Sequence, residues 1–395
     1  MQTAEAASVA KPVQSATRAE TLAAMTRTGP DTVAGRYLRR FWHPVLLAQE
    51  LPVGRALPVQ ALGEELTVYR GESGEAHAVA HRCAHRGAQL SVGTVEGETI
   101  RCLYHGWRYD AAGACTQRPA EPPSASRATI RIRSYPLVEY LGLLFVFLGE
   151  GDPPARPHFP ELERAGVLES SSYLRHCNYF QNLENGVDEA HLPFVHRQTL
   201  FDVLNYAVPE ISARETPYGL VQTARRPDGR VNEAHCLMPN MLTFVYPASD
   251  DPAVQGWTRY LSWRVPVDDH THKTFILEHF DVCPDSEASF RGRRAQRREQ
   301  IAALPARSEV ASGILAGKAR LQDYADRPDY LLLGDDVAQR AQGVVQDRSV
   351  ERLGRSDAAV LLLRRIWARE LAAMESRSEP TAWECRIPLS RTSES

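Results

Sequence analysis

The sequence lacks any apolar stretch long enough to cross a membrane as a helix. Its longest apolar run, residues 141–148, is far shorter than the ~20 residues that a bilayer crossing requires, and it fits a buried strand. The first twenty residues contain no apolar core of the signal-peptide type. The net charge of −3 gives no excess of either sign that would favour nucleic acid or an anionic membrane. We therefore expect a soluble, cytoplasmic protein that binds neither.

Cysteines are few and mostly scattered. Seven are present, and five of them lie far apart, at Cys115, Cys177, Cys236, Cys283 and Cys385. This odd, dispersed set provides no disulfide framework and indicates reduced thiols. The sequence also contains no G-x-G-x-x-G turn for a dinucleotide and no four-cysteine group for a ferredoxin cluster. The chain therefore shows no motif of its own for a dinucleotide or for a ferredoxin cluster.

The other two cysteines belong to two short motifs, C-A-H from Cys83 and C-L-Y-H from Cys102. Each motif offers one thiolate and one imidazole, because Cys83 is followed by His85 and Cys102 by His105. A Rieske [2Fe–2S] centre uses two cysteines on one iron and two histidines on the other. A Cys2His2 zinc site usually keeps its cysteines together and its histidines together. The mixed pairs favour the Rieske centre over zinc or a chance grouping.

The length of 395 residues allows two domains with substantial cores. A Gly-, Asp- and Pro-rich stretch at residues 149–160 gives the best boundary between them. We expect a partly disordered N-terminal lead at 1–37, a small antiparallel β-domain at 38–150 and a second domain at 151–395. Strand-like segments at 241–246, 259–265 and 274–282, with helical stretches at 290–306 and 357–374, predict an α+β fold.

A second candidate metal site lies just inside the second domain, in the segment E-N-G-V-D-E-A-H-L-P-F-V-H from Glu184. His191 and His196 are five residues apart, and Pro193 between them would distort the local turn. Two such histidines supply two ligands of a 2-His-1-carboxylate triad, which holds O2-activating Fe(II). Asp188 is placed to hydrogen-bond a ligand imidazole. The alternative is two structural histidines, but a Rieske motif in the same chain favours iron.

With these motifs, the sequence resembles the oxygenase component of Rieske non-heme iron oxygenases over nearly its full length. It is closest in pattern to the phthalate- and phenoxybenzoate-dioxygenase-like group, which has one type of oxygenase subunit. The segments that carry the resemblance are R-R-F-W-H-P from Arg39, L-G-E-E-L from Leu62, R-C-L-Y-H-G-W from Arg101, P-A-E-P from Pro119, L-E-N-G-V-D-E-A-H-L-P-F-V-H from Leu183, V-P-V-D-D from Val265 and D-R-S-V-E-R-L-G-R-S-D from Asp347.

The resemblance implies a Rieske β-domain followed by a helix-grip catalytic domain, in which an antiparallel sheet wraps a long helix. It also implies a homotrimer in which the [2Fe–2S] centre of one subunit adjoins the mononuclear Fe(II) of its neighbour. Asp188 matches the family's aspartate that bridges the two centres. The family's third iron ligand is a downstream aspartate, which corresponds to Asp335, with the adjacent Asp336 as the alternative. Weaker candidates are Asp323, Asp326 and Asp329.

The resemblance implies an oxygenase component that uses O2 and electrons from a separate reductase of the flavin or ferredoxin type. NAD(P)H would supply those electrons only through this partner protein. The oxygenase would hydroxylate, dihydroxylate or oxidatively dealkylate a small, aromatic substrate. The same irons would also serve desaturation or oxidative cyclisation, and a Rieske electron carrier without oxygenase activity is a further alternative.

Several side chains are candidates for contact with substrate or partner. Met238, Met241, Phe244 and Tyr246, with His235 and Asn240 nearby, are candidates for a substrate pocket, although strand residues of this kind are more often plain core. Arg225, Arg226 and Arg230 flank a Pro-Asp-Gly turn that resembles an exposed hairpin tip. The arginine-rich stretch 290–298 fits a solvated helix face better than a docking site.

Overall fold

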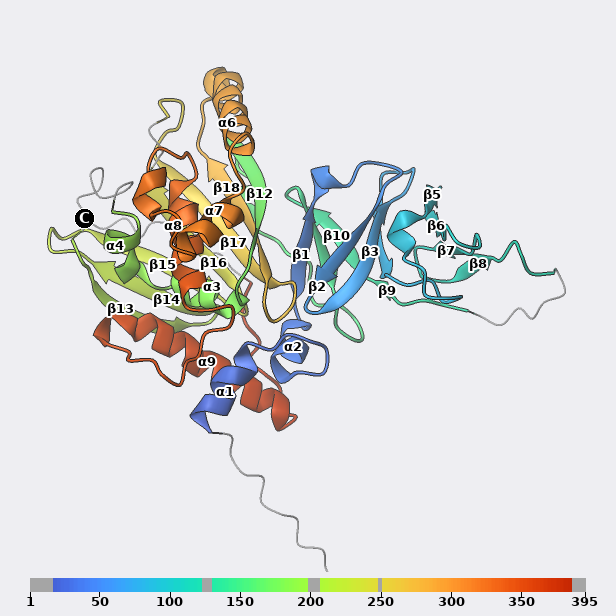
Figure 1. Ribbon diagram of the computed structural model, residues 1–395, viewed down its shortest axis with the longest axis horizontal. Helices are drawn as coiled ribbons and strands as arrows, with labels where there is room; N and C mark the ends of the chain where they lie inside the picture. The colour runs from blue at the N-terminus through green and yellow to red at the C-terminus, as the bar shows by residue number, and fades with distance from the viewer. Residues whose placement is uncertain (1–16, 123–129, 198–206, 248–250, 386–395) are drawn as a thin grey trace, which may run out of the picture.

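The structure is a computed structural model that describes residues 17–122, 130–197, 207–247 and 251–385. Two β-rich halves lie side by side along its longest axis (Figure 1). The half nearer the N-terminus holds three small antiparallel sheets, and the other holds one seven-stranded antiparallel sheet with most of the helices. The predicted α+β class, with an antiparallel β-domain ahead of the helix-bearing one, is confirmed.

The first half is built from short strands in the sheet orders β1-β11-β10, β2-β3-β4-β9 and β5-β6-β7-β8. The last of these sheets forms the far end of the molecule in Figure 1. The predicted buried strand at 141–148 is β11, which pairs with β1 and β10 along its two edges and whose residues all lie in the hydrophobic core. The elements are β1 (Trp42–Leu47), η1 (Ala48–Glu50), β2 (Ala56–Ala61), β3 (Glu64–Arg70), β4 (Ala76–Ala80), η2 (Leu90–Val92), β5 (Thr94–Glu96), β6 (Thr99–Arg101), β7 (Arg108–Asp110), β8 (Cys115–Gln117), β9 (Ser134–Tyr135), β10 (Leu137–Tyr140) and β11 (Leu143–Phe147).

The second half is organised by a sheet of order β12-β18-β17-β16-β15-β14-β13. Its strands are β12 (Val167–Arg175), β13 (Glu210–Thr216), β14 (Gly219–Arg225), β15 (Val231–Leu237), β16 (Met241–Pro247), β17 (Trp257–Pro266) and β18 (His272–Phe280). Its helices are η3 (Pro160–Leu162), α3 (Tyr179–Gly186), η4 (Glu189–His191), α4 (Leu192–Val195), η5 (Pro284–Ser286), α6 (Glu287–Ala302), α7 (Arg307–Leu315), η6 (Leu321–Tyr324), α8 (Tyr330–Ala341), η7 (Arg355–Asp357) and α9 (Ala358–Glu375). The strands and helices predicted in this half are present with shifted ends.

One face of this sheet looks toward α3. Strand register sets Leu242 opposite Ser262 and Ser262 opposite Ile276, so the three side chains share a face. A side chain added at Gly186 of α3 would meet Leu242 at 3.0 Å. This face therefore supports the helix that leads into the two histidines.

Helices α1 (Arg18–Met25) and α2 (Val33–Leu38) precede the first strand and pack on α9, beside the second half rather than the first (Figure 1). Trp367 of α9 makes edge contacts with Tyr37 of α2 and with Phe180 of α3. Part of the expected N-terminal lead is thus folded, and residues 1–16 lie outside the described chain. The domain ends at 37/38 and 150/151 stay predictions.

The two halves share a hydrophobic core. The two halves meet at Trp263 of β17, and we call this contact region the joint. The Trp263 ring makes T-shaped contacts with Phe145 of β11 at 5.5 Å and with Phe159 at 5.6 Å between ring centroids. Aromatic pairs in this geometry contribute beyond the area that they bury. None of the helices within the described ranges combines the length and the apolar character that a bilayer crossing needs.

We expect Trp263→Ala to lower the free energy of unfolding by about 3–5 kcal/mol, because it empties a large volume at the joint of the two halves. Urea and thermal unfolding would measure the change. The control is Val350→Ala, whose side chain is 69% exposed. Equal stability losses in the two variants would contradict this account of the core.

Candidate metal centres

Two loops in the first half carry the four predicted cluster ligands, and both loops fold alike. In one, Gly87 N–H donates to Cys83 O and Cys83 N–H donates to Ala88 O. In the other, Gly106 N–H donates to Cys102 O at 3.1 Å and Cys102 N–H donates to the carbonyl of the residue after the glycine. Gly87 and Gly106 have φ of 71° and 72°, a region that glycine enters without strain. Two matching turns therefore present one cysteine each.

The side chains of these loops form a mixed sulfur and nitrogen site. Cys83 and Cys102 are 3% and 2% exposed, and the His85 and His105 rings lie 4.5 Å apart between centroids. The ring of Trp107 stacks on His85 at 4.7 Å. Among the described residues, nothing hydrogen-bonds the buried Nδ1 of His85, which leaves that atom available as a ligand. Buried thiols beside paired imidazoles fit a [2Fe–2S] cluster of the Rieske type.

Burial acts in opposite directions on the two kinds of ligand, since it lowers the pKa of one imidazole and raises the pKa of one thiol. Desolvation, together with the charges of His85 and Arg86, lowers the pKa of His105, so its imidazole stays neutral as iron ligation requires. Burial raises the pKa of Cys102, so a bound metal is needed to hold it as a thiolate. Tyr109 Oη lies 3.2 Å from Cys83 Sγ and accepts a hydrogen bond from the Ala84 N–H. These contacts hold the loop that carries Cys83 and His85 against β7.

The second candidate centre gathers side chains from α3, η4, α4 and α8. Asp188 starts η4 by accepting a hydrogen bond from Ala190 N–H, and Pro193 begins the next helical turn. This chain path brings His191 and His196 to face Asp335 of α8. Their ligand atoms lie within 4.8 Å of one another, with Nε2 of His196 at 3.3 Å and Nε2 of His191 at 3.6 Å from Asp335 Oδ1.

These distances suit one shared ion. Ligand atoms about 2 Å from a single metal lie roughly 3 Å from each other. Asp335 Oδ1 is buried and accepts no hydrogen bond within the part of the chain that the structure describes. A buried carboxylate oxygen without a donor is costly unless a cation compensates it. The three residues therefore fit a 2-His-1-carboxylate metal site.

The proton position on His191 is set by the backbone. His191 Nδ1 lies against the Asp188 carbonyl oxygen and can only donate to it, which leaves Nε2 without a proton on the side of Asp335. Asn185 lies beside the same ring, with Nδ2 3.3 Å from His191 Nε2, and its Oδ1 accepts from Gln339 Nε2 at 2.6 Å. The side chain of Asp188 is 30% exposed. Burial raises the pKa of Asp188, against the opposing charge of His191.

Asp335 and Asp336 face different surroundings although they are adjacent in sequence. Asp336 is buried between Arg175 and Arg307, whose Nε atoms both donate to it. Burial alone would raise the pKa of Asp335, but the imidazoles of His196 and His191 and the Arg175 guanidinium hold that pKa at about 2. The geometry thus favours Asp335 as the ligand. Asp323 and Asp326 are exposed, and Asp329 is paired with Arg327.

The two candidate centres lie toward opposite ends of the molecule along its longest axis (Figure 1). The cluster loops flank the small sheet β5-β6-β7-β8 at one end of Figure 1, and α4 lies toward the other end. The cluster loops also expose apolar side chains, since Leu103 is 71% and Tyr104 is 58% exposed. Beside the histidines, Phe194 is 69% exposed.

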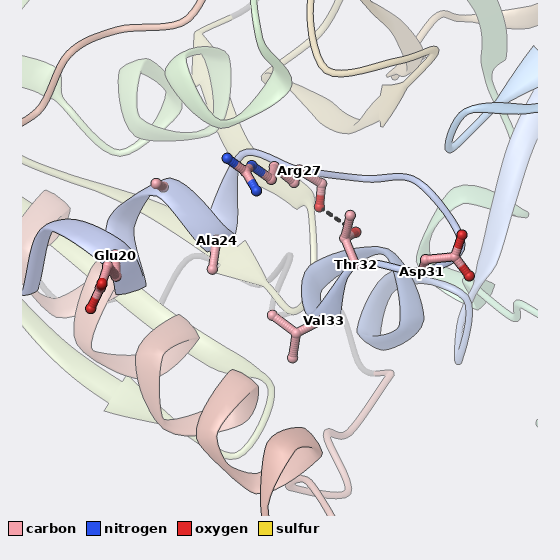
Figure 2. A pocket seen from close by; sticks show the side chains of 7 residues that line it. Glu20, Ala24, Arg27, Asp31, Thr32 and Val33 are labelled. Atoms are coloured by element: carbon pink, nitrogen blue, oxygen red, sulfur yellow. Dashed lines mark hydrogen bonds between the residues drawn. The ribbon is translucent and has the colours of Figure 1, made fainter. Parts of the chain in front are cut away.

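Two surface hollows of the described residues lie away from the proposed ligands of either centre. One lies at α1 and α2, where Figure 2 shows Glu20, Arg27 and Asp31 pointing in different directions. Another lies behind α8, on the Asp336 and Arg307 side. Of the pocket candidates, Asn240 hydrogen-bonds the Arg264 carbonyl, a structural role. Phe244, by contrast, stacks on Tyr260 at 4.6 Å on the sheet face shared with Leu242.

The arginine predictions are partly wrong. Arg225 and Arg230 are exposed as expected, but Arg226 is buried and its Nη2 donates to Glu189 at 2.6 Å. The carboxylate of Glu189 draws this guanidinium inward from the hairpin tip. On α6, by contrast, the arginines fit a helix face with partners inside the chain, as Arg293 pairs with Asp251 and Arg294 with Glu169. The residues that sequence reasoning missed are Arg175, Asn185, Glu189 and Gln339.

The chain is similar to known proteins in sequence and in fold. Residues 41–136 match the Rieske [2Fe-2S] domain family. The phenoxybenzoate dioxygenase subunit alpha of Ectopseudomonas oleovorans is 30% identical over 90% of this chain and 86% of its own length. The 5,5'-dehydrodivanillate O-demethylase oxygenase subunit of Sphingobium sp. is 28% identical over 91% and 81%. The NdmA structure from Pseudomonas putida CBB5 superposes with a TM-score of 0.66 at 24% identity, covering 86% of this chain and 92% of that one.

The chain belongs to the oxygenase subunits of the Rieske non-heme iron oxygenases. It is an oxidoreductase of the Rieske type, the oxygenase component of a multicomponent enzyme.

We expect Asp335→Asn to abolish binding of a single Fe(II) per chain beyond the Rieske iron, because it removes the only anionic member of the triad. Asp336→Asn should instead lower stability by about 3–5 kcal/mol, because it strands two arginines, and leave iron binding in the folded fraction. Iron analysis after anaerobic reconstitution, with unfolding curves, separates the two. Full iron binding by Asp335→Asn would contradict the assignment.

Proposed function

We propose that the protein receives electrons from a separate reductase at its [2Fe–2S] cluster and uses O2 to hydroxylate or oxidatively dealkylate a small aromatic substrate at a mononuclear iron. The carrying observation is the convergence of His191, His196 and Asp335 in a chain that also has the Rieske loops. Fe(II) held by these three residues would supply the chemistry that activates O2. Cys83, His85, Cys102 and His105 would hold the cluster.

The protein's own groups prepare the iron site. The Asp188 carbonyl fixes the proton of His191 on Nδ1. Asn185 of α3 lies beside the His191 ring, and Gln339 of α8 donates a hydrogen bond to Asn185. The low pKa of Asp335 keeps that carboxylate charged across the working pH range. Such outer contacts orient ligands before the metal arrives.

We further propose a homotrimer in which the cluster loops of one subunit dock beside Asp188 of the next. The separation of the two centres within one chain supports this, because electrons would otherwise have to cross the length of the molecule. The exposed Leu103 and Tyr104 supply apolar contact area at one end of such an interface. Asp188, partly exposed and fixed to His191, supplies the polar link at the other.

The proposed substrate class is argued from the sheet face that looks toward α3 and from the names of the relatives. Phe244 and Tyr260 form a stacked aromatic pair on the face that looks toward α3, a surface that suits a planar ring. Relatives are named for phthalate, for dehydrodivanillate and for methylxanthine. One is named both a tert-butanol monooxygenase and a tert-amyl alcohol desaturase, which keeps desaturation as the second candidate.

Seven free cysteines fit a cytoplasmic location.

The test is substrate-dependent NADH consumption with a surrogate reductase, across aromatic acids, aryl ethers and methylamines. Incorporation of labelled O2 into product indicates oxygenation, whereas an unlabelled alkene or ring-closed product indicates desaturation or cyclisation. A Rieske protein that reduces and reoxidises but binds no further iron would leave only an electron carrier.

We expect Asp188→Asn to slow oxidation of the reduced cluster in a single turnover by at least roughly 10–100-fold, because the amide changes the link between the two centres. Both metals should stay bound, since the amide oxygen still accepts from Ala190. Stopped-flow absorbance of the cluster gives the rate. The control is Glu299→Gln on the exposed face of α6. An unchanged rate in Asp188→Asn would refute the bridging role.

A further inference from the structure

A buried ion pair sits under the turn that carries the proposed iron ligands. Glu189, the residue after Asp188, is 9% exposed, and Arg226 at the end of β14 is 3% exposed. Glu189 Oε1 accepts from Arg226 Nη2 at 2.6 Å and from Asn232 Nδ2 at 3.0 Å. Its Oε2 lies 3.5 Å from Gln222 Nε2. The hairpin of β14 and β15 thus grips one side chain of η4 from several points.

The gripped residue shares a peptide bond with the group that orients His191. That bond joins Asp188 to Glu189, and its carbonyl oxygen is the acceptor for His191 Nδ1. The Asp188 carboxylate caps the same turn through Ala190 N–H. Any rotation of Glu189 would therefore move the hydrogen bond that aims His191 Nε2.

The same hairpin offers an internal comparison. At its tip, Arg230 pairs with Asp228 at 2.7 Å, but both side chains are about half exposed, at 44% and 45%. Water screens such a pair, so it contributes little. The Arg226–Glu189 pair is screened far less, and loss of one partner strands a buried charge beneath the ligand turn.

We propose that Glu189 and Arg226 are positioning residues that fix the Asp188–His191 turn for iron binding. This inference rests on the proposed mononuclear iron. The pair holds the peptide between residues 188 and 189, that peptide holds the imidazole, and the imidazole meets the metal. A merely structural pair would support the fold but would leave the iron affinity of folded protein unchanged.

The experiment uses the full chain with its Rieske cluster loaded and measures Fe(II) affinity anaerobically, normalised to the cluster absorbance. The variants are Glu189→Gln, Arg226→Met and Arg226→Lys, and the matched control is Arg230→Met. We expect Glu189→Gln and Arg226→Met to weaken Fe(II) binding by roughly 10–100-fold. Arg226→Lys, which keeps the charge, should recover part of the loss, and Arg230→Met should stay within about twofold of the parent protein. The electron paramagnetic resonance signal of the nitric oxide adduct should broaden where the turn is loosened.

Parent-like affinity in both Glu189→Gln and Arg226→Met would overturn the proposal, including where their melting temperature falls. Should Arg226→Met fail to fold, Glu189→Gln, which preserves side-chain shape, and Arg226→Lys decide the question by the same affinity measurement. If the parent chain itself binds no Fe(II), the proposed function fails. If parent and variants bind it equally, only the positioning role fails.

Discussion

Buried arginine–carboxylate pairs set the framework on which the second metal centre depends. Three carboxylates that each adjoin a residue of the site are held this way, one in α3, one in η4 and one in α8. Glu184 precedes Asn185 and accepts from Arg348 at 2.6 Å and from Arg364 at 2.5 Å. Glu189 accepts from Arg226, and Asp336 accepts from Arg175. Each pair therefore fixes the backbone next to a residue that binds, or contacts a residue of, the proposed triad.

Such pairs are costly to bury and gain little net stability, but they are strongly directional. A guanidinium fork fixes the direction of a carboxylate, and the carboxylate fixes the helix or turn that bears it. Burial of apolar surface is not directional in this sense, so it does not by itself fix where a carboxylate points. Arg175 takes part in several of these contacts. It donates to Asp336 and to Gln339, and Gln339 in turn donates to Asn185. The charge of Arg175 also helps to lower the pKa of Asp335.

The sequence was most informative where chemistry is local. The loops around Cys83 and Cys102 contain their ligands and glycines within a few residues, and the histidine pair is equally compact. By contrast, the choice between Asp335 and Asp336 depends on the rotation of α8, because consecutive helical residues point about 100° apart. The burial of Arg226 was not predicted, because its partner Glu189 lies 37 residues away and only tertiary packing joins them. A buried ion pair of that separation leaves no pattern along the chain.

The division of the two centres between the ends of one chain makes assembly part of the proposed site. A monomer leaves Leu103 and Tyr104 in water beside the cluster, and Phe194 in water beside the histidines. Exposed apolar side chains at both centres favour an interface with another subunit. Between the two halves of one subunit, by contrast, Trp263 and its aromatic neighbours are buried. The joint also fixes the relative orientation of the halves, since Phe145 and Phe159 clasp Trp263. If the cluster of each subunit lies beside its neighbour's iron, the contact between subunits is head-to-tail. Such a contact either closes into a ring, as in the proposed trimer, or continues as an open filament.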